Sequence, residues 1–244
     1  MARARRCILV VAAESEARAV MAGFLARAKK GKLPVWELIP LDTHHTLVVS
    51  GIGKGNAGAA VGRCVEKGSC SYVVSVGLAG ALPGARPLPL GAVVAATHCV
   101  YADEGAMTPR GFFDCAELGF PVAPAPFEGN RAKVPERVLS RLRPLANRCD
   151  PIATVSTCSG TDELARVTAV RTGAAAEAME GAAVAATAAR LGVAFGELRV
   201  ISNTTGDRER QVWDVKGALE RLRWVMGRMR EMSSKSETRD SRWE

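Results

Sequence analysis

The stretch CILVVAAESEARAVMAGFLA, residues 7–26, contains a short apolar run followed by an amphipathic segment. Residues 7–11 have the length and β-branched content of a buried strand, and apolar residues recur at helical spacing from residue 15 onward. The same alternation predicts strands at residues 7–11, 47–50, 72–76, 92–100, 152–156 and 195–202, and helices at residues 15–28, 56–66, 135–146, 161–171, 181–191 and 215–230. It favours an α/β protein, a three-layer α/β/α sandwich with a central mixed sheet that is mostly parallel.

The chain shows no internal repeat and no long linker, so residues 1–232 are expected to form a single domain. A chain of 244 residues buries enough apolar surface to fold without a disulfide or a metal. The proline-rich stretch 121–126 is expected to be a loop inside that domain. The final residues, 233–244, are polar and are expected to form a disordered tail.

The formal net charge of +8 is compatible with nucleic acid, an anionic small molecule or solubility alone. The basic clusters are not interleaved with aromatic residues and match no recognition motif, so we expect no nucleic-acid partner. No apolar stretch reaches the roughly 18 residues of a membrane span, so no membrane partner is expected. The seven cysteines contain no CxxC pair, which predicts buried thiols in a reducing cytoplasm and no metal site.

A glycine motif, Gly53-Lys-Gly55-Asn-Ala-Gly58, follows a predicted strand and precedes a predicted helix. A dinucleotide site would need an acidic residue about 20 positions later, and residues 67–102 contain none. A phosphate-binding P-loop would need Ser or Thr after Lys54, where the chain has Gly55. We therefore expect no nucleotide cofactor.

Acidic residues occur at two places at the edges of predicted elements. Glu14 and Glu16 follow the first strand, where open α/β sheets bind ligands, although either could simply stabilise a helix N-terminus. Glu180 precedes the alanine-rich helix among apolar residues that would bury it. A buried carboxylate needs hydrogen-bond donors, and the two hydroxyl groups of a sugar diol are suitable ones. The alternative is a helix cap, for which Glu is a poor choice.

Two further places follow predicted strands. Gly77-Leu-Ala-Gly80 comes after the strand predicted to end at Val76, and its small residues would let backbone amides face a ligand. The alternative is a tight turn without a ligand. Asn203 stands at the exit of the strand 195–202, where it is either a ligand contact or a turn-forming residue.

Taken together, these places resemble the nucleoside phosphorylase/hydrolase superfamily, and within it the purine nucleosidases. The matching motifs occur in the family's order: Glu14-Ser-Glu16, Ser50-Gly-Ile-Gly-Lys54, Gly77-Leu-Ala-Gly80, Ala178-Met-Glu-Gly181 and Arg199-Val-Ile-Ser-Asn203. Residues 201–213 and Ala102-Asp-Glu-Gly105 look most like the futalosine hydrolase branch. That branch removes hypoxanthine from futalosine in an alternative pathway of menaquinone biosynthesis.

The resemblance implies cleavage of an N-glycosidic bond without a cofactor or a metal. Glu16 would activate water, Asn203 would meet the N7 side of the leaving purine, and Glu180 would hold the ribose hydroxyls. The other implied substrate contacts are Ile52, Ala79, Gly80, Cys158, Met179, Ser202 and Arg208. Arg208, Arg210 and Lys54 are candidates for the aryl carboxylate on the 5′ side of futalosine, and the alternative for each is a surface or intramolecular ion pair. The resemblance also implies a homo-oligomer, a dimer or larger, to which Phe112 and Phe113 could contribute.

The identity of residue 203 favours a 6-oxopurine. Adenine-directed relatives carry Asp there, whereas O6 and N7 of hypoxanthine are both acceptors that an amide can donate to. The alternatives are a methylthioadenosine/S-adenosylhomocysteine nucleosidase and a phosphate-dependent purine nucleoside phosphorylase. The carboxylates Glu14 and Glu16 would repel phosphate and so favour water. A noncatalytic nucleoside-binding protein is a further alternative.

Overall fold

The computed structural model describes residues 6–25, 31–66 and 70–240. Its helices are α1 (Glu14–Phe24), α2 (Lys54–Cys64), α3 (Glu136–Leu142), the 3-10 turn η1 (Arg143–Leu145), α4 (Asp162–Thr172), α5 (Gly181–Arg190) and α6 (Val215–Asp240). Its strands are β1 (Cys7–Val11), β2 (Ile39–Pro40), β3 (His45–Val49), β4 (Tyr72–Ala81), β5 (Val93–Tyr101), β6 (Gly105–Thr108), β7 (Gly111–Asp114), β8 (Phe127–Glu128), β9 (Arg131–Lys133), β10 (Arg148–Thr154), β11 (Ala176–Ala178) and β12 (Ala194–Thr204). None of the helices in the described ranges is long and apolar enough to cross a membrane.

A mixed sheet forms the centre of the molecule, and β6 and β7 form a separate hairpin. From one edge, the path through the sheet is β2-β3-β1-β4-β11-β10-β5-β9-β8. The pairs β1/β3, β1/β4, β4/β12, β10/β11 and β5/β10 are parallel. The pairs β4/β11 and β5/β12 are antiparallel, so the sheet has the mixed character that the sequence predicted.

The strand β12 pairs with both β4 and β5. Because β4, β11, β10 and β5 are also successive neighbours, these five strands form a closed ring of pairings. Hydrophobic alternation along the chain shows which segments are strands, but it does not show which strand pairs with two others. The closure therefore appears only in the structure.

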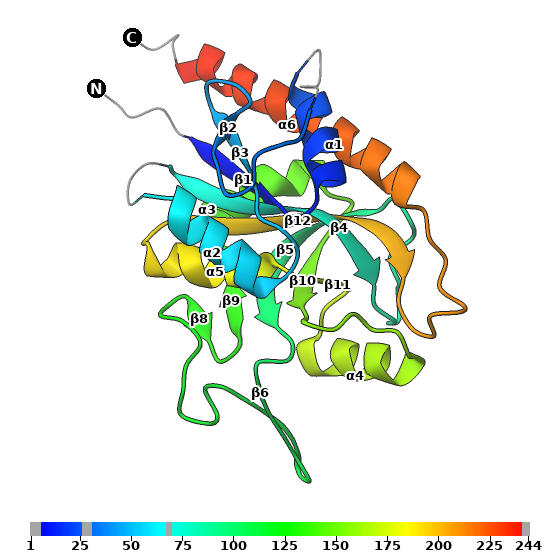
Figure 1. Cartoon of the computed structure of the whole chain (residues 1–244). Coiled ribbons are helices and arrows are strands. Elements are labelled where there is room, and N and C mark those ends of the chain that lie inside the picture. The colour runs from blue at the N-terminus through cyan, green and yellow to red at the C-terminus, as the bar shows by residue number, and fades with distance from the viewer. Residues whose placement is uncertain (1–5, 26–30, 67–69, 241–244) are drawn as a thin grey trace.

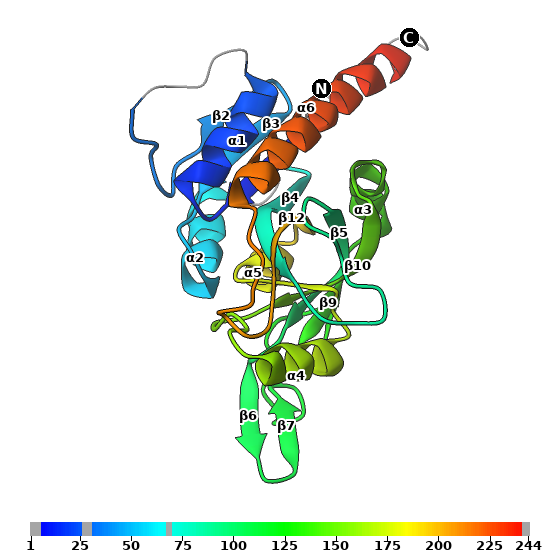
Figure 2. The same cartoon turned by 90° about the vertical axis from the view of Figure 1, so that its right-hand side faces the viewer.

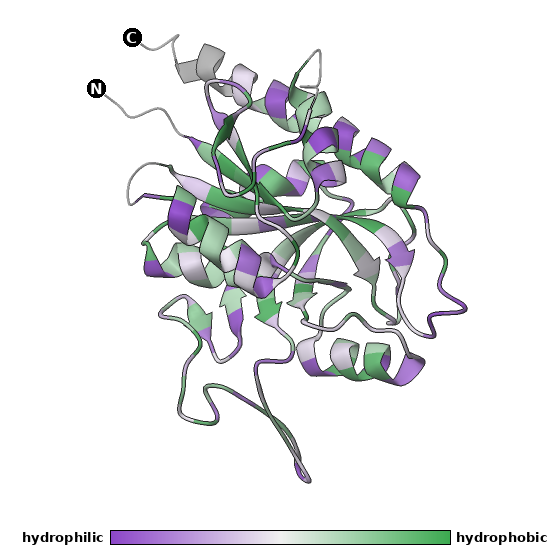
Figure 3. Cartoon of the chain, viewed as in Figure 1, coloured by the Kyte–Doolittle hydropathy of each residue, from purple (hydrophilic) through white to green (hydrophobic). Residues whose placement is uncertain are grey.

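Helices cover both faces of the sheet. The helices α1 and α6 pack against each other on one face, and α2 and α5 pack against each other on the opposite face (Figures 1 and 2). All five residues of β1 are buried, which explains its unbroken apolar run. Apolar residues are concentrated in the strands of the sheet, while polar residues recur along the helices that cover it (Figure 3).

Each predicted strand and helix overlaps one in the structure, but two bounds differ in ways that matter. The strand β4 does not end at Val76: it continues to Ala81, so Gly77-Leu-Ala-Gly80 lies inside the strand and not in the turn after it. The reason is that β12 pairs with β4 along this whole length.

The helix α6 continues to Asp240, beyond the predicted end at residue 230 and into the segment predicted as a tail. Residues 26–28 of the first predicted helix and 241–244 of that tail lie outside the described residues.

Candidate active site

Glu16 lies in the first turn of α1, directly after β1, and is 7% exposed. Its Oε2 accepts hydrogen bonds from the backbone N–H groups of Ala12 (3.2 Å) and Ala13 (2.9 Å), and its Oε1 accepts one from Leu78 (2.8 Å). Burial raises the pKa of Glu16, while Arg199 and the backbone donors oppose that shift. The carboxylate is thus held firmly and takes up a proton more readily than an exposed glutamate.

Arg199 stands in one of the motifs quoted from the sequence, but the sequence analysis gave its side chain no role, and the structure places it at the centre of the charged groups. It lies on β12, is 1% exposed, and its Nη2 is 3.2 Å from Glu180 Oε2. Its Nε donates to Glu197 Oε1 (2.9 Å), and Nη2 also donates to Ser75 Oγ (2.8 Å). The nearby carboxylates hold the pKa of Arg199 above its ordinary value despite burial, which itself lowers it. An arginine two residues after a glutamate inside a predicted buried strand was the available signal in the sequence.

Glu180 is 5% exposed and stands at the N-cap position of α5, as the sequence predicted. It makes no side-chain cap hydrogen bond to its own helix. Instead, its Oε1 accepts from the backbone N–H of Gly53 (3.0 Å), and its Oε2 accepts weakly from Met179 (3.3 Å) and faces Arg199. The carboxylate therefore joins the glycine loop before α2 to the strand β12.

Gly77 provides the room in which the charged groups meet. A Cβ at this position would lie 2.5 Å from Glu16 Oε1 and 2.8 Å from Arg199 Nη1. Any other residue would push these groups apart. The glycine is required because the charged groups pack directly against the backbone of β4, which is a different reason from the turn considered from the sequence.

Glu197 is fully buried beside Arg199, on the same strand. Its Oε2 has no hydrogen-bond partner among the described residues, and it packs so closely on α5 that a Cβ at Gly181 would lie 2.0 Å from it. Burial raises the pKa of Glu197, with Arg199 opposing the shift. Glu16, Glu180 and Glu197 thus surround a single guanidinium, so the cluster carries more negative than positive groups.

Asn203 and Ser202 lie where β12 bulges against β4. The Ser202 hydroxyl is within hydrogen-bond distance of Asn203 Oδ1 (2.9 Å) and of the Ala79 carbonyl (3.3 Å). Asn203 Nδ2 donates to the Thr204 carbonyl (2.9 Å) and lies 3.0 Å from where a Cβ of Gly80 would be. These contacts use the amide oxygen as an acceptor and leave Nδ2 with a second N–H to donate.

The remaining predicted substrate contacts differ in their burial. Cys158 is exposed, but the surrounding protein still removes part of the water around its thiol. This loss of water is the main reason why the thiol pKa is raised; Glu177 and Glu180 add to the rise, and Arg208 opposes it. Met179 is adjacent to Glu180 and partly buried. Ile52 is 61% exposed on the loop before α2, so its side chain is not packed into the cluster.

The three candidates for the 5′ carboxylate differ in what they already contact. Lys54 Nζ pairs with Asp103 and with Glu104 (3.1 Å), and Arg210 pairs with Asp162 and with Asp207 (2.9 Å). Arg208 instead stacks over the Trp213 ring (4.5 Å) and donates to the Gln211 side-chain oxygen (3.1 Å).

Of the three, only Arg208 makes no ion pair within the described part of the chain. It is therefore the one whose charge is not already neutralised by a neighbouring carboxylate.

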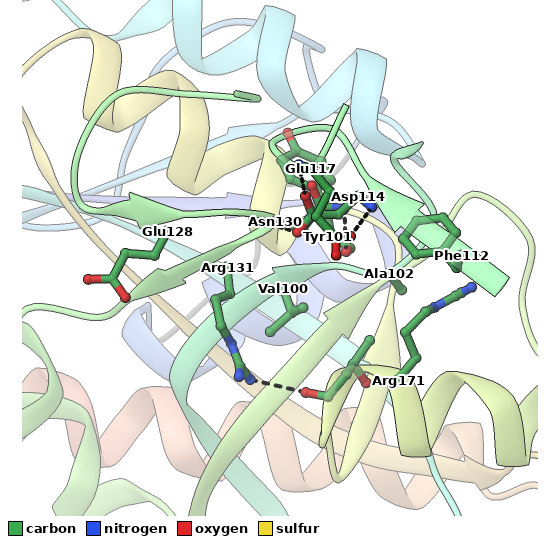
Figure 4. A pocket seen from close by; sticks show the side chains of 11 residues that line it. Val100, Tyr101, Ala102, Phe112, Asp114, Glu117, Glu128, Asn130, Arg131 and Arg171 are labelled. Atoms are coloured by element: carbon green, nitrogen blue, oxygen red, sulfur yellow. Dashed lines mark hydrogen bonds between the residues drawn. The ribbon is translucent and has the colours of Figure 1, made fainter. Parts of the chain in front are cut away.

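A separate pocket of about 200 Å³ lies near the β6–β7 hairpin (Figure 4). It is lined by Val100, Tyr101, Ala102, Phe112, Asp114, Glu117, Glu128, Asn130, Arg131, Arg171 and Thr172, none of which was predicted to contact substrate. Arg171 stacks on Phe112 (4.2 Å), while Arg131 donates to the Thr172 carbonyl (3.1 Å). The carboxylates around Arg199 are not part of this pocket. In the described ranges, no three His, Cys, Asp or Glu side chains are grouped so as to hold a metal ion.

This arrangement can stabilise positive charge and move a proton. Glu16 and Glu180 provide negative charge at two sides of one guanidinium, and Glu16 also has the raised pKa of a proton acceptor. Asn203 offers an amide donor at the far end of the same two strands, β4 and β12. Gly77 lies beside Glu16 and Arg199, and Gly80 lies beside Asn203. The two glycines are three residues apart on β4, so the charged groups and the amide are about 10 Å from each other.

Known proteins resemble this chain in sequence and in fold. The family model described as "Phosphorylase superfamily" matches residues 39–232. A futalosine hydrolase of Acidothermus cellulolyticus is 37% identical over 221 residues, which are 89% of this chain and 86% of that protein. A futalosine hydrolase of Streptomyces coelicolor is 32% identical over 230 residues, 91% of this chain and 94% of that protein.

Two solved structures from Helicobacter pylori share the fold. A 5′-methylthioadenosine/S-adenosylhomocysteine nucleosidase superimposes with a TM-score of 0.70 at 18% identity, covering 96% of this chain and 99% of that one. The native structure of a futalosine hydrolase superimposes with a TM-score of 0.69 at 17% identity, covering 95% and 98%.

Proposed function

Because the chain belongs to the phosphorylase superfamily, and within it to the futalosine hydrolases, we propose that it hydrolyses the N-glycosidic bond of futalosine and releases hypoxanthine. The reaction is one step of menaquinone biosynthesis. The observation that carries the proposal is the group of three buried carboxylates, Glu16, Glu180 and Glu197, around the single guanidinium of Arg199. Such a group suits a reaction in which the sugar becomes positively charged.

Water is the nucleophile that this charge balance favours. A phosphorylase must bind a phosphate beside the ribose, and an excess of buried carboxylates would repel that anion. Glu16 accepts a proton from the attacking water, which its raised pKa favours. Glu180 accepts hydrogen bonds from the ribose 2′ and 3′ hydroxyls, and its charge stabilises the oxocarbenium-like transition state. Met179, next to it, packs beside the ribose.

The leaving base meets Asn203. Negative charge develops on the purine as the bond breaks, and the Asn203 amide donates to N7 and O6 of hypoxanthine without a charge penalty. The Thr204 carbonyl, which can only accept and lies 2.9 Å from Nδ2, supports the orientation in which Nδ2 is the donor. Ala79, Gly80 and the loop carrying Cys158 line the base pocket, and Ile52 contributes to the substrate site from the loop before α2.

Arg208 is the best supported partner of the aryl carboxylate on the 5′ side. Lys54 and Arg210 already pair with carboxylates, whereas the Arg208 guanidinium contacts an aromatic ring and a neutral amide. A stacked guanidinium still has N–H groups available for a carboxylate. We further propose a single domain over residues 1–232, a cytoplasmic location and a homo-oligomer, a dimer or larger.

One chromatographic assay tests the proposed function. Purified protein is incubated with futalosine, methylthioadenosine and inosine, with and without phosphate, and the released base is identified. Hypoxanthine released from futalosine without phosphate is the expected result. Release of adenine alone would indicate a methylthioadenosine/S-adenosylhomocysteine nucleosidase, and a strict need for phosphate would indicate a phosphorylase. Binding of nucleoside without release of any base would indicate a noncatalytic protein.

A further inference from the structure

Glu197 is a buried carboxylate to which the proposed reaction gives no step. It lies on β12 two residues before Arg199, and the two side chains leave the same face of the strand because strand side chains alternate. In the parallel pairing with β4, Glu197 lies opposite Ser75 and Arg199 lies opposite Gly77. Asn203, the proposed contact of the base, follows Arg199 toward the end of β12. Glu197 is therefore one side-chain repeat farther from the base than Arg199 is.

Glu197 holds Arg199 through Nε, while other groups contact the two terminal nitrogens of the guanidinium. Nε donates to Glu197 Oε1 (2.9 Å). Nη2 donates to Ser75 Oγ (2.8 Å) and faces Glu180 Oε2 (3.2 Å), and Nη1 donates to the Leu78 carbonyl (3.4 Å). Because the guanidinium is planar and rigid, the contact at Nε sets the direction in which Nη2 meets Glu180.

The Glu197 carboxylate also packs against the first residue of α5. A side chain at Gly181 would overlap Glu197 Oε2, so the carboxylate lies directly on the helix backbone. Gly181 follows Glu180, which stands at the N-cap position of the same helix. Glu197 thus touches both structures that set the position of Glu180, which are the guanidinium of Arg199 and the N-terminus of α5.

Glu197 is also the carboxylate that acts most strongly on the charge of Arg199. Burial lowers the pKa of Arg199, and three carboxylates oppose that shift, Glu197 before Glu180 and Glu16. The thiol of Cys99 on β5 lies beside Glu197 but adds no charge, because burial raises the pKa of this thiol well above its ordinary value and Glu197 raises it further. The charge that Glu197 balances is therefore that of Arg199.

The proposed reaction would be opposed by an unbalanced cation near the ribose. The sugar becomes positively charged in the transition state, and negative groups stabilise it. Arg199 contacts Glu180 and lies near Glu16, so its positive charge offsets part of the negative charge of these two groups. A third carboxylate on the same guanidinium restores that negative charge without any contact with the substrate.

We propose that Glu197 is a positioning residue for this reaction: it fixes Arg199 through Nε and cancels its charge, so that Glu180 and Glu16 act on the ribose with their full negative charge. The inference rests on the proposed function, because it concerns the same site. Glu197 acts through Arg199 and touches neither the nucleoside nor the attacking water.

Two analogues of futalosine that cannot be hydrolysed measure the charge at the ribose. Both carry a hypoxanthine-like base on a C–C bond; one keeps the ring oxygen of the ribose, and the other has a protonated ring nitrogen in its place. Calorimetry gives the Kd of each analogue for the wild type and for Glu197→Gln, which keeps the shape and lacks the charge. The Kd of the cationic analogue should rise about 10- to 30-fold in the variant, the effect of one charge about 8 Å away at the effective dielectric of a protein.

The neutral analogue is the internal reference, and its Kd should stay within about twofold. A merely structural role would weaken the binding of both analogues alike, which would overturn the inference. Unchanged Kd values for both would overturn it as well, since the ribose would then not sense the charge of Glu197. In steady-state assays with futalosine, kcat of Glu197→Gln should fall about 10-fold while KM stays within a few-fold.

Two further variants separate charge from shape. Glu197→Asp keeps the charge on a shorter side chain, so the preference for the cationic analogue should persist; its loss there too would contradict the inference. Glu163→Gln is the matched control, because Glu163 is exposed and pairs only with Arg166 among the described residues, and it should leave both Kd values unchanged. If the wild type bound neither analogue and released no hypoxanthine from futalosine, the proposed function would fail and this inference with it.

Discussion

Arg199 Nη2 lies 3.2 Å from Glu180 Oε2, and both side chains are almost fully buried. The contact joins β12, which carries Arg199, to the N-terminus of α5, which carries Glu180. The same guanidinium also binds Glu197 and lies near Glu16. The relative positions of the proposed base and the proposed ribose ligand therefore depend on one cation.

Removing that cation should cost stability as well as activity. In Arg199→Met, three buried carboxylates lose their counter-charge, and we expect the free energy of unfolding to fall by about 3–5 kcal/mol. Urea denaturation of the variant and the wild type measures this difference. Arg143→Met is the matched control, because Arg143 is half-exposed and pairs with the exposed Glu136; its effect should stay below about 1 kcal/mol. Similar losses in the two variants would show that the buried cluster does not depend on Arg199.

Replacing the proposed base should separate catalysis from binding. In Glu16→Gln, the side chain keeps its shape but has no basic oxygen to take a proton, and its NH2 group cannot accept from the backbone N–H groups that bind both oxygens of Glu16. We expect kcat to fall by about 10² to 10⁴. Futalosine binding, measured by calorimetry on the inactive variant, should stay within a few-fold of the wild-type KM. Hydrolysis at a near wild-type rate would rule out Glu16 as the base.

The exchange Asn203→Asp should weaken hypoxanthine recognition. An ionised carboxylate beside O6 and N7 would face two acceptors, so kcat/KM for futalosine should fall at least about tenfold. The adenine counterpart, whose N7 can be protonated by an acid at this position, should lose less. Ratios of kcat/KM for the two substrates measure the change. An unchanged ratio would mean that residue 203 does not contact the base.

The site could be predicted in part from the sequence because several of its residues stand out locally. Glu16 and Glu180 interrupt apolar stretches at the ends of elements, and the structure places both beside one guanidinium. Arg199 was quoted in a family motif but given no role, because it lies inside a strand, where only the pairing of β12 with β4 gives it neighbours. For the same reason, the extension of β4 to Ala81 could not be predicted from residues 77–81 alone: it exists because β12 lies alongside.

Acid should weaken the docking of α6 against β3 through His45. This side chain is 1% exposed; its Nδ1 lies 2.9 Å from Asp42 Oδ1, and its Nε2 lies 3.3 Å from the Ser233 hydroxyl of α6. Burial lowers the pKa of His45 below 6.5, with Asp42 opposing the shift. The fold therefore prefers the neutral ring, so this contribution to stability is complete above pH 6.5 and is lost as the pH falls through the lowered value.

The comparison is between the wild type and His45→Gln, each denatured with urea at pH 7.5 and pH 5. The variant should be less stable at pH 7.5, but it should lose less stability on acidification than the wild type does. An equal loss in both proteins would show that His45 does not titrate in this range. Thermal unfolding followed by circular dichroism provides an independent measurement of the same difference.

The close contact between Gly181 and Glu197 predicts that a single methyl group will disturb the buried cluster. In Gly181→Ala, the new Cβ would lie 2.0 Å from Glu197 Oε2, and neither α5 nor β12 is free to move away, because both pack in the core. We expect a loss of about 1–3 kcal/mol in the free energy of unfolding.

Gly55→Ala is the matched control in the helix α2, where a Cβ would meet nothing within 4 Å. Alanine is favoured over glycine in a helix, so the control should be neutral or stabilised by about 0.5–1 kcal/mol. Activity assays add a second readout, since a displaced Glu197 would shift Arg199 away from Glu180 and lower kcat. If Gly181→Ala matched the control in both stability and kcat, the packing of Glu197 against α5 would be looser than these distances imply.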